Sequence, residues 1–290
     1  MRPNLRVGVA VLDFGRPLDA EQAAASARDP ALDVRVLIVE NGTGTAASGA
    51  DRLRLPENRG FAGGMNAGLE RLLAEGCDRI LLLNNDAVLD PGCLQSLATA
   101  LDDPALGAVG PVILRASDGR VESRGLSVDL GTGRVRMEGQ GEAAAERGGL
   151  VSADALSGAV MMLSRAALER IGLLDERYFF SFEDVDWCVR ARRAGFEVAV
   201  VLDARARHGG SRTIGASPAR LYYSARNHVA AAHKLEPRSG VRGWLRDGAI
   251  LGLNLAHALK QQEIGRMTAC RAVVAGYRDA LRGRFGSRPV

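Results

Sequence analysis

The residues Ile80-Leu81-Leu82-Leu83-Asn84-Asn85-Asp86 form an apolar run that ends abruptly in two amides and a carboxylate. A short run of this kind is typical of a strand that is buried on both faces of a parallel sheet. Its polar residues then lie at the carboxyl end of the strand, where open α/β sheets bind their ligands. The segment therefore predicts an α/β fold with a binding site at that edge of the sheet.

Strand-like and helix-like patterns alternate on both sides of this run. The predicted strands cover residues 6–12, 34–39, 52–55, 80–83, 157–163 and 196–202. The predicted helices cover residues 18–28, 65–75, 165–171 and 184–194, and much of the chain from residue 218 onward. This alternation indicates βαβ units and a mostly parallel sheet. Residues 114–150 are Gly-rich and charged, and we expect hairpins or a loop there.

Composition limits the class of protein further. With 290 residues and 47% hydrophobic content, the chain can bury a large core. Its apolar stretches are far shorter than the roughly 20 residues of a membrane-spanning helix, and no secretion signal is recognisable at its start. The four cysteines are scattered without the paired spacing of a zinc site. We therefore expect a cytoplasmic protein with free thiols.

The net charge of +4 conceals an asymmetry along the chain. Residues 205–290 contain 16 Lys and Arg against 4 Asp and Glu, a net charge of +12, so the remainder carries −8. A basic C-terminal region of this kind either faces an anionic partner, such as a membrane surface or a lipid diphosphate, or is a solvated surface. No nucleic-acid-binding module is recognisable, so we expect no nucleic-acid partner.

A second acidic cluster lies between Tyr178 and Trp187, where three carboxylates stand among five aromatic residues. Such surroundings raise the pKa of a carboxylate toward that of a working base. Glu183 and Asp186 are three residues apart on a predicted helix, and Arg190 on the same face can neutralise both. That pairing leaves Asp184 free to take a proton from an alcohol.

Three other features are ambiguous when each is taken alone. The Gly-rich segment 60–64 is either a tight turn or a place where backbone N–H groups approach an anion, and it matches neither the dinucleotide fingerprint nor the P-loop. Asp86 is suited to a divalent cation that also binds diphosphate, or to capping the helix that follows Pro91. His208 is either a metal ligand or a surface histidine.

In combination, these motifs resemble the family-2 glycosyltransferases, and particularly the bacterial rhamnosyltransferase-like group. The resemblance covers nearly the whole chain, and it is specific because the motifs occur in a set order and spacing. The segments that carry it are Val39-Glu40-Asn41, residues 58–68, Leu82-Leu83-Asn84-Asn85-Asp86, Gly158-Ala159, residues 179–190, His208, Tyr222-Tyr223 and Arg226-Asn227.

The resemblance implies a single nucleotide-binding domain of the GT-A fold, with a mostly parallel central sheet and a helical, basic C-terminal extension. We expect the catalytic domain at residues 1–215, with a donor half at about 1–112 and an acceptor half at about 113–215. The extension then covers residues 216–290. The implied activity is inverting transfer of a hexose, rhamnose or another deoxyhexose among them, from a dTDP- or UDP-sugar with Mg²⁺ or Mn²⁺ as cofactor. The implied pathway is cell-surface polysaccharide biosynthesis.

By matched position, the resemblance also implies roles for individual residues. Asp184 would be the general base and Glu183 would orient it, while Asp86 and His208 would bind the metal. Trp187 would stack on an acceptor sugar, with Asp186 beside it. The residues implied on the donor side are Phe14, Glu40, Asn41, Gly63, Gly64, Asn66, Asn84, Asn85 and Asp86.

The chain departs from the family pattern at three places. Asp13-Phe14-Gly15 replaces Thr-Tyr-Asn, Glu40 replaces Asp, and Asn84 replaces the first Asp of the metal motif. These changes alter the base pocket and remove one ligand charge. A non-catalytic protein that binds sugar nucleotides or glycans is therefore one alternative. A sugar nucleotidyltransferase is another, although it needs no acceptor base such as the cluster of Glu183 and Asp184.

The acceptor is expected to be a hydroxyl of a glycan, a glycolipid or a small molecule. The basic C-terminal region predicts peripheral attachment at the inner face of the plasma membrane, with Trp244 and Leu245 as apolar contacts. The alternative is that residues 249–259 pack on the catalytic domain or pair two chains as a homodimer.

Overall fold

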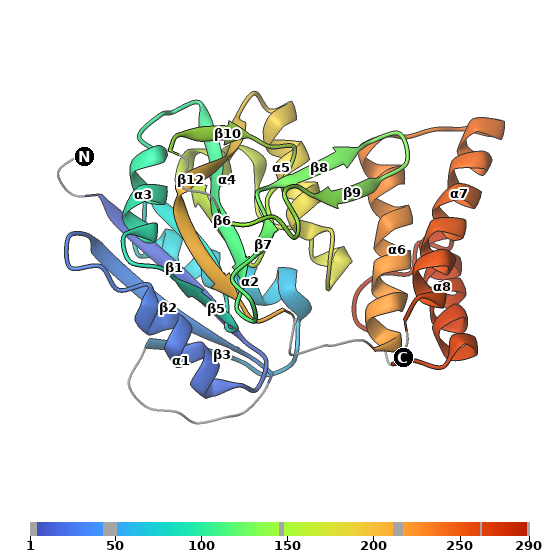
Figure 1. Cartoon of the computed structure of the whole chain (residues 1–290), viewed down its shortest axis with the longest axis horizontal. Coiled ribbons are helices and arrows are strands. Elements are labelled where there is room, and N and C mark those ends of the chain that lie inside the picture. Colours follow the sequence, from blue (N-terminus) through green and yellow to red (C-terminus); the bar gives the residue numbers. More distant parts are fainter. Residues whose placement is uncertain (1–4, 43–50, 145–147, 211–216, 262, 289–290) are drawn as a thin grey trace.

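The computed structural model describes residues 5–42, 51–144, 148–210, 217–261 and 263–288. They form a mixed α/β domain and, at its side, a group of three helices that ends the chain (Figure 1). The strands are β1 (Arg6–Asp13), β2 (Asp33–Asn41), β3 (Asp51–Leu55), β4 (Arg79–Asn84), β5 (Ala87–Leu89), β6 (Leu106–Arg115), β7 (Val121–Ser123), β8 (Leu126–Asp129), β9 (Arg134–Met137), β10 (Leu150–Ser152), β11 (Val160–Ser164) and β12 (Glu197–His208). The helices are α1 (Pro17–Ser26), α2 (Gly60–Ala74), α3 (Cys93–Ala100), α4 (Arg165–Ile171), the 3₁₀ turn η1 (Glu176–Tyr178), α5 (Glu183–Arg193), α6 (Pro218–Leu235), α7 (Gly240–Leu259) and α8 (Arg266–Leu281).

One large sheet organises the domain, with the main strand order β10-β12-β6-β11-β4-β1-β2-β3. Strands β3, β2, β1 and β4 run parallel to one another, as do β6 and β12, while β11 is antiparallel between β4 and β6. The short strands β5 and β7 pair with β12 and β6, and β8 and β9 form a separate hairpin. The prediction of a largely parallel central sheet in an α/β fold is confirmed.

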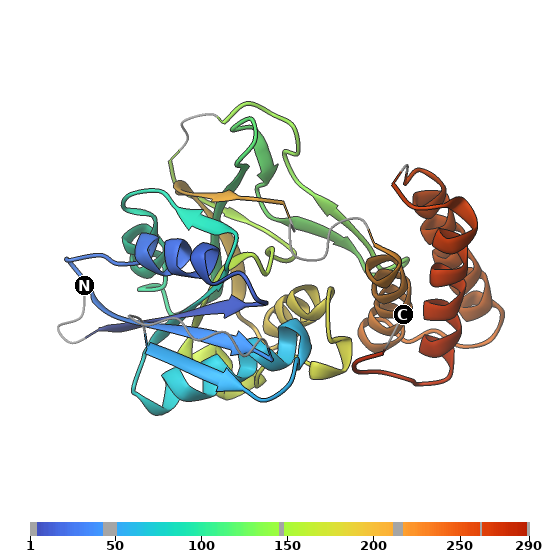
Figure 2. The same cartoon turned by 90° about the horizontal axis from the view of Figure 1, so that it is seen from below.

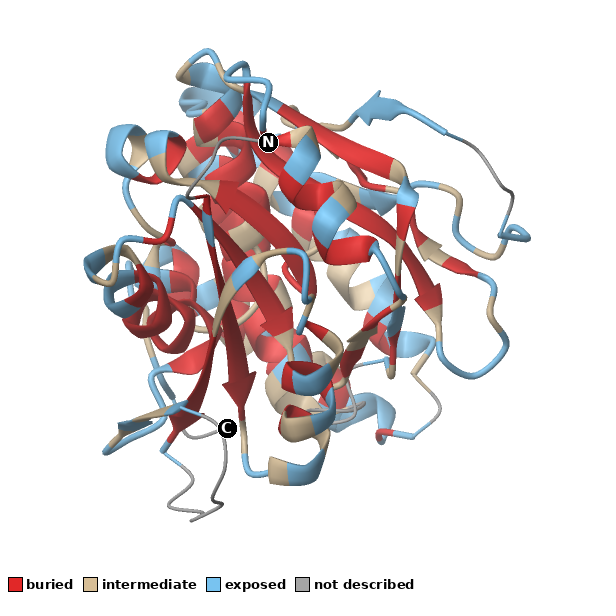
Figure 3. Ribbon diagram, turned by 90° about the vertical axis from the view of Figure 1, so that its left-hand side faces the viewer, coloured by how far each residue is buried: buried red, intermediate tan, exposed pale blue. Residues whose placement is uncertain are grey.

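Side-chain alternation along the strands divides the core into two layers. On β1, Val9 and Val11 join the cluster that includes residues of α1 and α3, while Ala10 and Leu12 join the cluster with α2 and α5. Both sets are buried because helices cover both faces of the sheet (Figure 3). This two-sided burial explains the continuous apolar run at residues 80–83.

Helix α2 begins at Gly60, five residues before the predicted start, so the Gly-rich segment is helical rather than a turn. Its glycines let the helix lie close to the sheet. A Cβ atom on Gly64 would lie 2.5 Å from Leu12 Cδ1, and one on Gly68 would lie 3.0 Å from Ala10 Cβ. Close packing is therefore one physical reason for glycine at these two positions.

Other predicted elements differ mainly in length. Strand β12 continues to His208, six residues beyond the predicted end, and the strands β5 and β6 were not predicted. The segment 114–150 contains the β8–β9 hairpin, as expected. The expected boundary between catalytic domain and extension falls within residues 211–216, outside the described residues.

The three C-terminal helices form a unit beside the sheet domain (Figure 2). They enclose small apolar clusters of their own, but α6 also contributes Ala231 and Leu235 to the core of the sheet domain. Helix α6 is thus shared by both parts. Within the described residues, no helix combines the length and apolar character needed to cross a bilayer.

We expect Gly64→Ala to lower the stability of the protein by about 1–3 kcal/mol, because the added methyl overpacks the contact between α2 and β1. Gly248→Ala on α7 is the matched control, since its Cβ would meet nothing within 4 Å. This control should raise stability by about 0.5–1 kcal/mol. Urea unfolding of both variants measures the two effects, and equal stabilisation by both would contradict the packing explanation.

Candidate functional site

The two acidic clusters meet at one edge of the sheet through a short backbone link. The N–H of Asn84, at the end of β4, donates to the carbonyl of Ala159 at 2.9 Å. The N–H of the preceding residue, Gly158, donates to Asp184 Oδ2 at 2.8 Å. The carboxyl end of β4 and the start of α5 are therefore both in contact with the segment 158–159.

A cluster of Asp86, His208 and Glu122 lies on the β4 side, with His208 buried and the two carboxylates partly buried. His208 comes at the end of β12 and pairs with Ala87 on β5. Its Nε2 is 3.2 Å from Asp86 Oδ1, and its Nδ1 is 2.9 Å from Glu122 Oε1. Burial lowers the pKa of His208, but the bonds to Asp86 and Glu122 outweigh it and raise that pKa to about 9.

The donor set fits a divalent cation at two of its atoms. Ligand atoms about 2.1 Å from one ion lie about 3 Å apart when they are neighbours, which matches the separation of Asp86 Oδ1 and His208 Nε2. Glu122 binds the opposite ring nitrogen, so it orients the imidazole without sharing the ion. Accordingly, no group of three such side chains converges on one point in the described part of the chain.

Asp184 and Glu183 occupy the first turn of α5. Asp184 is half-buried, and its second oxygen, Oδ1, accepts the N–H of Val185 at 2.8 Å. Burial raises the pKa of Asp184, and its bonds to the backbone N–H groups of Gly158 and Val185 oppose the rise. Burial, with the adjacent Asp184 charge, raises the pKa of Glu183. A carboxylate with a raised pKa is suited to accept a proton.

The residues expected around a nucleotide base lie at the ends of β1 and β2. Glu40 is buried and forms ion pairs with Arg52 at 3.0 Å and Arg54 at 2.9 Å. Asn41 donates to Gly60 O at 2.8 Å, so it ties β2 to the start of α2. Phe14 is half-buried against the core. Their contact with a nucleotide stays a prediction.

Asn85 brings the ends of β4 and β1 together, because its amide donates to Asp13 Oδ1 at 3.4 Å. Asp13 is fully buried, and the same oxygen accepts the N–H of Arg16 at 2.7 Å. Asn84 is the last residue of β4, and Asp86 follows Asn85 directly. The polar cluster at residues 84–86 is thus assembled where it was predicted, and its role toward a donor stays a prediction.

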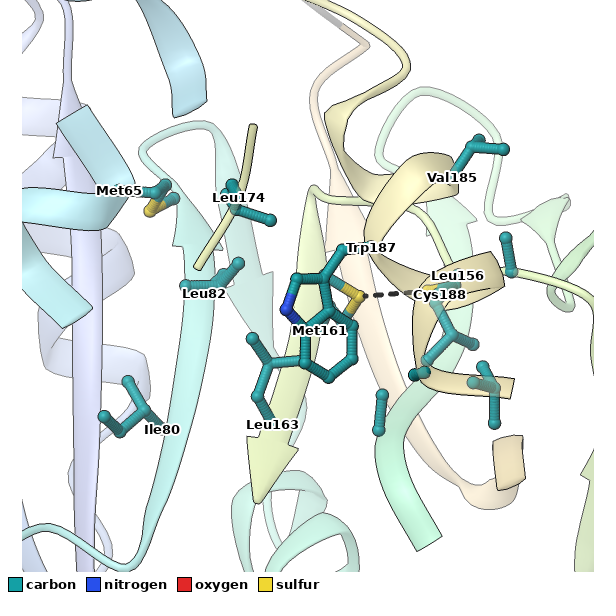
Figure 4. Packing of buried hydrophobic residues seen from close by; sticks show 14 of the residues in the cluster. Met65, Ile80, Leu82, Leu156, Met161, Leu163, Leu174, Val185, Trp187 and Cys188 are labelled. Atoms are coloured by element: carbon teal, nitrogen blue, oxygen red, sulfur yellow. Dashed lines mark hydrogen bonds between the residues drawn. The ribbon is translucent and has the colours of Figure 1, made fainter. Parts of the chain in front are cut away.

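Three expected contacts are corrected by burial. Trp187 lies fully inside the core, where its Nε1 donates to Gly172 O at 2.9 Å, so neither face of its ring can stack on an acceptor (Figure 4). Asp186 is also fully buried, and it pairs with Arg190 at 2.9 Å and Lys234 at 2.6 Å.

Asn66 on α2 is the third corrected residue. It is buried, and its side chain exchanges hydrogen bonds with the backbone of Leu174 at 2.9 and 3.0 Å, so its polar atoms are engaged within the protein. A Cβ on Gly63 would lie 2.8 Å from Arg59 Cβ, so this glycine too is packed against protein. In the first turns of α2, the side-chain positions of Gly63, Gly64 and Asn66 thus serve internal packing.

Glu122 is a site residue that was not predicted. It lies on the short strand β7 inside the Gly-rich segment 114–150, and no motif surrounds it. Arg226 and Asn227 on α6 were noted only as part of a motif. In the structure both side chains bond the loop that precedes Glu183.

A family model described as glycosyltransferase-like family 2 matches residues 21–229, most of the chain. A dTDP-rhamnosyl transferase of Shigella flexneri is 24% identical over 188 residues, which is 60% of each chain. An N-acetylglucosaminyl-diphospho-decaprenol L-rhamnosyltransferase of Mycobacterium tuberculosis is 29% identical over 232 residues, 69% of this chain and 72% of the relative.

Solved structures share the fold at lower identity. A mannosyltransferase of Pyrobaculum calidifontis in complex with GDP-Man and Mn²⁺ has a TM-score of 0.56 at 16% identity, covering 96% of this chain and 87% of that one. Residues 1–349 of TarS from S. aureus, in complex with UDP-GlcNAc, have a TM-score of 0.56 at 13% identity, covering 95% and 81%. Both are glycosyltransferases of the GT-A type, which confirms the predicted fold.

We expect Glu122→Ala to weaken Mn²⁺ binding about 10–100-fold, because the partner on the second nitrogen fixes the ring that offers Nε2 to the ion. Glu122→Gln should lose less, since its amide oxygen can still accept the Nδ1 proton. The EPR signal of free Mn²⁺ during titration measures binding without relying on activity.

Glu142→Ala is the control for this experiment, because Glu142 is an exposed carboxylate that pairs with Arg124. Unchanged Mn²⁺ binding in Glu122→Ala, together with lost binding in Asp86→Ala, would show that the ring needs no partner to hold its orientation.

Proposed function

The chain belongs to glycosyltransferase family 2, and on that basis we propose that it is an inverting, metal-dependent hexosyltransferase. The observation that carries the proposal is the backbone link between its two acidic clusters. The segment 158–159 contacts Asp184 through the N–H of Gly158 and Asn84 through the carbonyl of Ala159, and Asn84 is two residues before Asp86, which pairs with His208. Inverting transfer needs this arrangement, with a base on the acceptor side and charge stabilisation on the side of the leaving diphosphate.

In the proposed reaction, Asp184 accepts the proton of an acceptor hydroxyl as that oxygen bonds to the anomeric carbon. The bond from this carbon to the diphosphate oxygen breaks, and the diphosphate leaves from the opposite face. Glu183 is the neighbour of Asp184 in the chain and is buried. Its burial and the charge of Asp184 raise the pKa of Glu183, so the two carboxyl groups together bind a proton more tightly. Asp86 and His208 would hold the divalent cation, which supplies positive charge to the departing diphosphate.

We further propose a dTDP- or UDP-sugar donor with rhamnose or another deoxyhexose as the sugar. The names of the Shigella and Mycobacterium relatives support rhamnose, and the second of these names includes a diphospho-decaprenol acceptor. The chain spans only 60% of the length of the Shigella relative, so its donor and acceptor are proposals for this chain alone. A glycan, glycolipid or small-molecule hydroxyl is the proposed acceptor class, in cell-surface polysaccharide synthesis.

The C-terminal helices support a peripheral contact with an anionic membrane surface at the cytoplasmic side. Eight of the twelve exposed large apolar residues in the described chain lie on α7 and α8. Val241, Trp244 and Leu245 share one face of α7 and are 75%, 83% and 69% exposed. Residues 240–288 contain nine Lys and Arg against three Asp and Glu.

This charge favours an anionic lipid surface over a homodimer through the same face. Two of the three acidic residues are already engaged, Asp247 with His233 at 2.9 Å and Asp279 with Tyr222 at 2.9 Å. Two copies of the face would bring like charges together, which costs free energy. Anionic lipid instead gains about 1 kcal/mol for each basic residue near the surface.

We expect Asp184→Asn to lower kcat about 10²–10⁴-fold, because the amide cannot accept the hydroxyl proton. Its thermal stabilisation by the donor nucleotide and Mn²⁺ should equal that of the unmodified protein, since Asp184 lies on the acceptor side. Release of nucleoside diphosphate during transfer measures the rate. Full activity in this variant would remove Asp184 from the role of base.

The same assay separates the alternatives. Pyrophosphate release from a nucleoside triphosphate and a sugar phosphate would identify a nucleotidyltransferase. Metal-dependent stabilisation by a nucleotide sugar without turnover of any acceptor would identify a binding protein.

For the membrane contact, we expect the protein to float with vesicles that contain anionic lipid at low salt and to be released at high salt. Trp244→Ala combined with Leu245→Ala should abolish flotation. Leu150→Ala combined with Val151→Ala is the matched control, because these exposed apolar residues lie on β10 in the sheet domain. Flotation lost equally in both pairs, or a concentration-dependent dimer that only the first pair disrupts, would argue against the lipid contact.

A further inference from the structure

The loop that leads into Glu183 and Asp184 has an unusual backbone. Phe179, Ser181 and Phe182 have φ angles of 61°, 73° and 77°, and in the described chain they are the non-glycine residues with positive φ. Each such conformation costs on the order of 1–3 kcal/mol and persists only where the surrounding structure holds it. Phe182 is the N-cap residue of α5, directly before Glu183, so the shape of the loop sets where the two carboxylates lie.

Asn227 on α6 holds this loop through its backbone. Its buried amide nitrogen lies 2.8 Å from Tyr178 O, 2.6 Å from Phe180 O and 2.8 Å from Ser181 O. Two amide hydrogens are thus shared among three carbonyl groups, which fixes their mutual positions. Its oxygen accepts Arg226 Nε at 2.9 Å.

Arg226 is completely buried and extends the same contact. Its Nη2 donates to Tyr178 O at 2.7 Å and to Arg177 O at 3.2 Å, and its Nη1 donates to Gly286 O at 2.7 Å. Burial lowers its pKa. A buried guanidinium bound to neutral carbonyls adds little to stability compared with an apolar residue of the same volume. A role in fixing the loop accounts for its presence.

Side chains of the loop are held by the same helix. The ring of Phe179 stacks on Tyr223 with centroids 5.1 Å apart, and that of Phe182 stacks on His228 at 5.5 Å. On its opposite side, the carbonyl of Phe179 accepts the N–H of Phe61 at 2.6 Å, in the first turn of α2. The loop is therefore fixed between α6 and α2.

We infer that Arg226 and Asn227 are positioning residues for the transfer reaction. They act through the carbonyl groups of residues 177–181, which set the place of Asp184, and they touch no reacting atom. The inference rests on the proposed role of Asp184 as base. It makes α6, outside the sheet, part of the machinery that orients the acceptor side of the site.

The test is the kinetics of Asn227→Ala and Arg226→Ala. We expect kcat to fall about 10²-fold, since a displacement of about 1 Å at a reacting group costs that much. KM for the donor and thermal stabilisation by the nucleotide with Mn²⁺ should stay the same, because the donor side is untouched. A loss of kcat that only follows the unfolded fraction of each variant would overturn the inference.

Arg246→Ala is the matched control for loss of a buried arginine. Arg246 is also buried in the helical unit, and its Nη1 donates to Ala232 O and Glu236 O, away from the loop. It should lower stability as Arg226→Ala does, with kcat per folded molecule unchanged. A fall in kcat equal to that of Arg226→Ala would mean that general loosening of the helices is the cause.

Rescue gives a second readout that a purely structural role would not produce. Glycine adopts positive φ without strain, so Ser181→Gly should raise the kcat of Asn227→Ala several-fold and change the unmodified protein little. A low kcat of Asn227→Ala that Ser181→Gly leaves unchanged would contradict the inference, and so would a kcat of Asn227→Ala that is already normal.

A double variant separates failure of the inference from failure of the proposed function. If Asn227 acts through Asp184, then Asp184→Asn combined with Asn227→Ala should be no slower than Asp184→Asn alone. Full activity of Asp184→Asn would reject the proposed base itself. An inactive Asp184→Asn with a fully active Asn227→Ala would reject only the positioning role.

Discussion

The backbone of residues 179–182 keeps its shape only because neighbouring elements hold it. These contacts join the sheet domain to the C-terminal helices. A loop with three positive φ angles at non-glycine residues is unstable on its own. Asn227 donates hydrogen bonds to the carbonyl groups of Tyr178, Phe180 and Ser181, and α2 supplies one to Phe179 through Phe61. The sheet thus positions Asp86 and His208, and helices α2 and α6 position the loop that leads to Asp184.

The fold was predictable because its signals are local and repetitive. The apolar run at residues 80–83 has the length and composition of a strand covered on both faces. In the structure these residues lie on β4 and are fully buried. The start of α2 was misplaced for a physical reason. Glycine usually signals a turn, but Gly64 and Gly68 lie inside a helix because β1 and β2 approach too closely for a side chain.

The candidate site was predictable only where a side chain's role follows from its place on an element. Asp86 and His208 come at strand ends, so their meeting follows from the sheet. Trp187 and Asp186 share a helix turn with Asp184, yet they face inward, and sequence spacing alone did not reveal which face was buried. Glu122 depends on a pairing across 86 residues, which no local pattern encodes.

The place of β12 in the sheet has a consequence for how the chain folds as it is synthesised. Strands β1 to β4 are complete early and pair with one another in the order β4-β1-β2-β3. The edge of β4 stays unpaired until β11 is made, and about 80 residues separate the end of β6 from the start of β12, its parallel neighbour. Until then the ribosome-bound chain exposes unpaired strand edges, which are templates for association with other chains. Nascent chains that pause between residues 115 and 197 are therefore the form of this protein most in need of a chaperone.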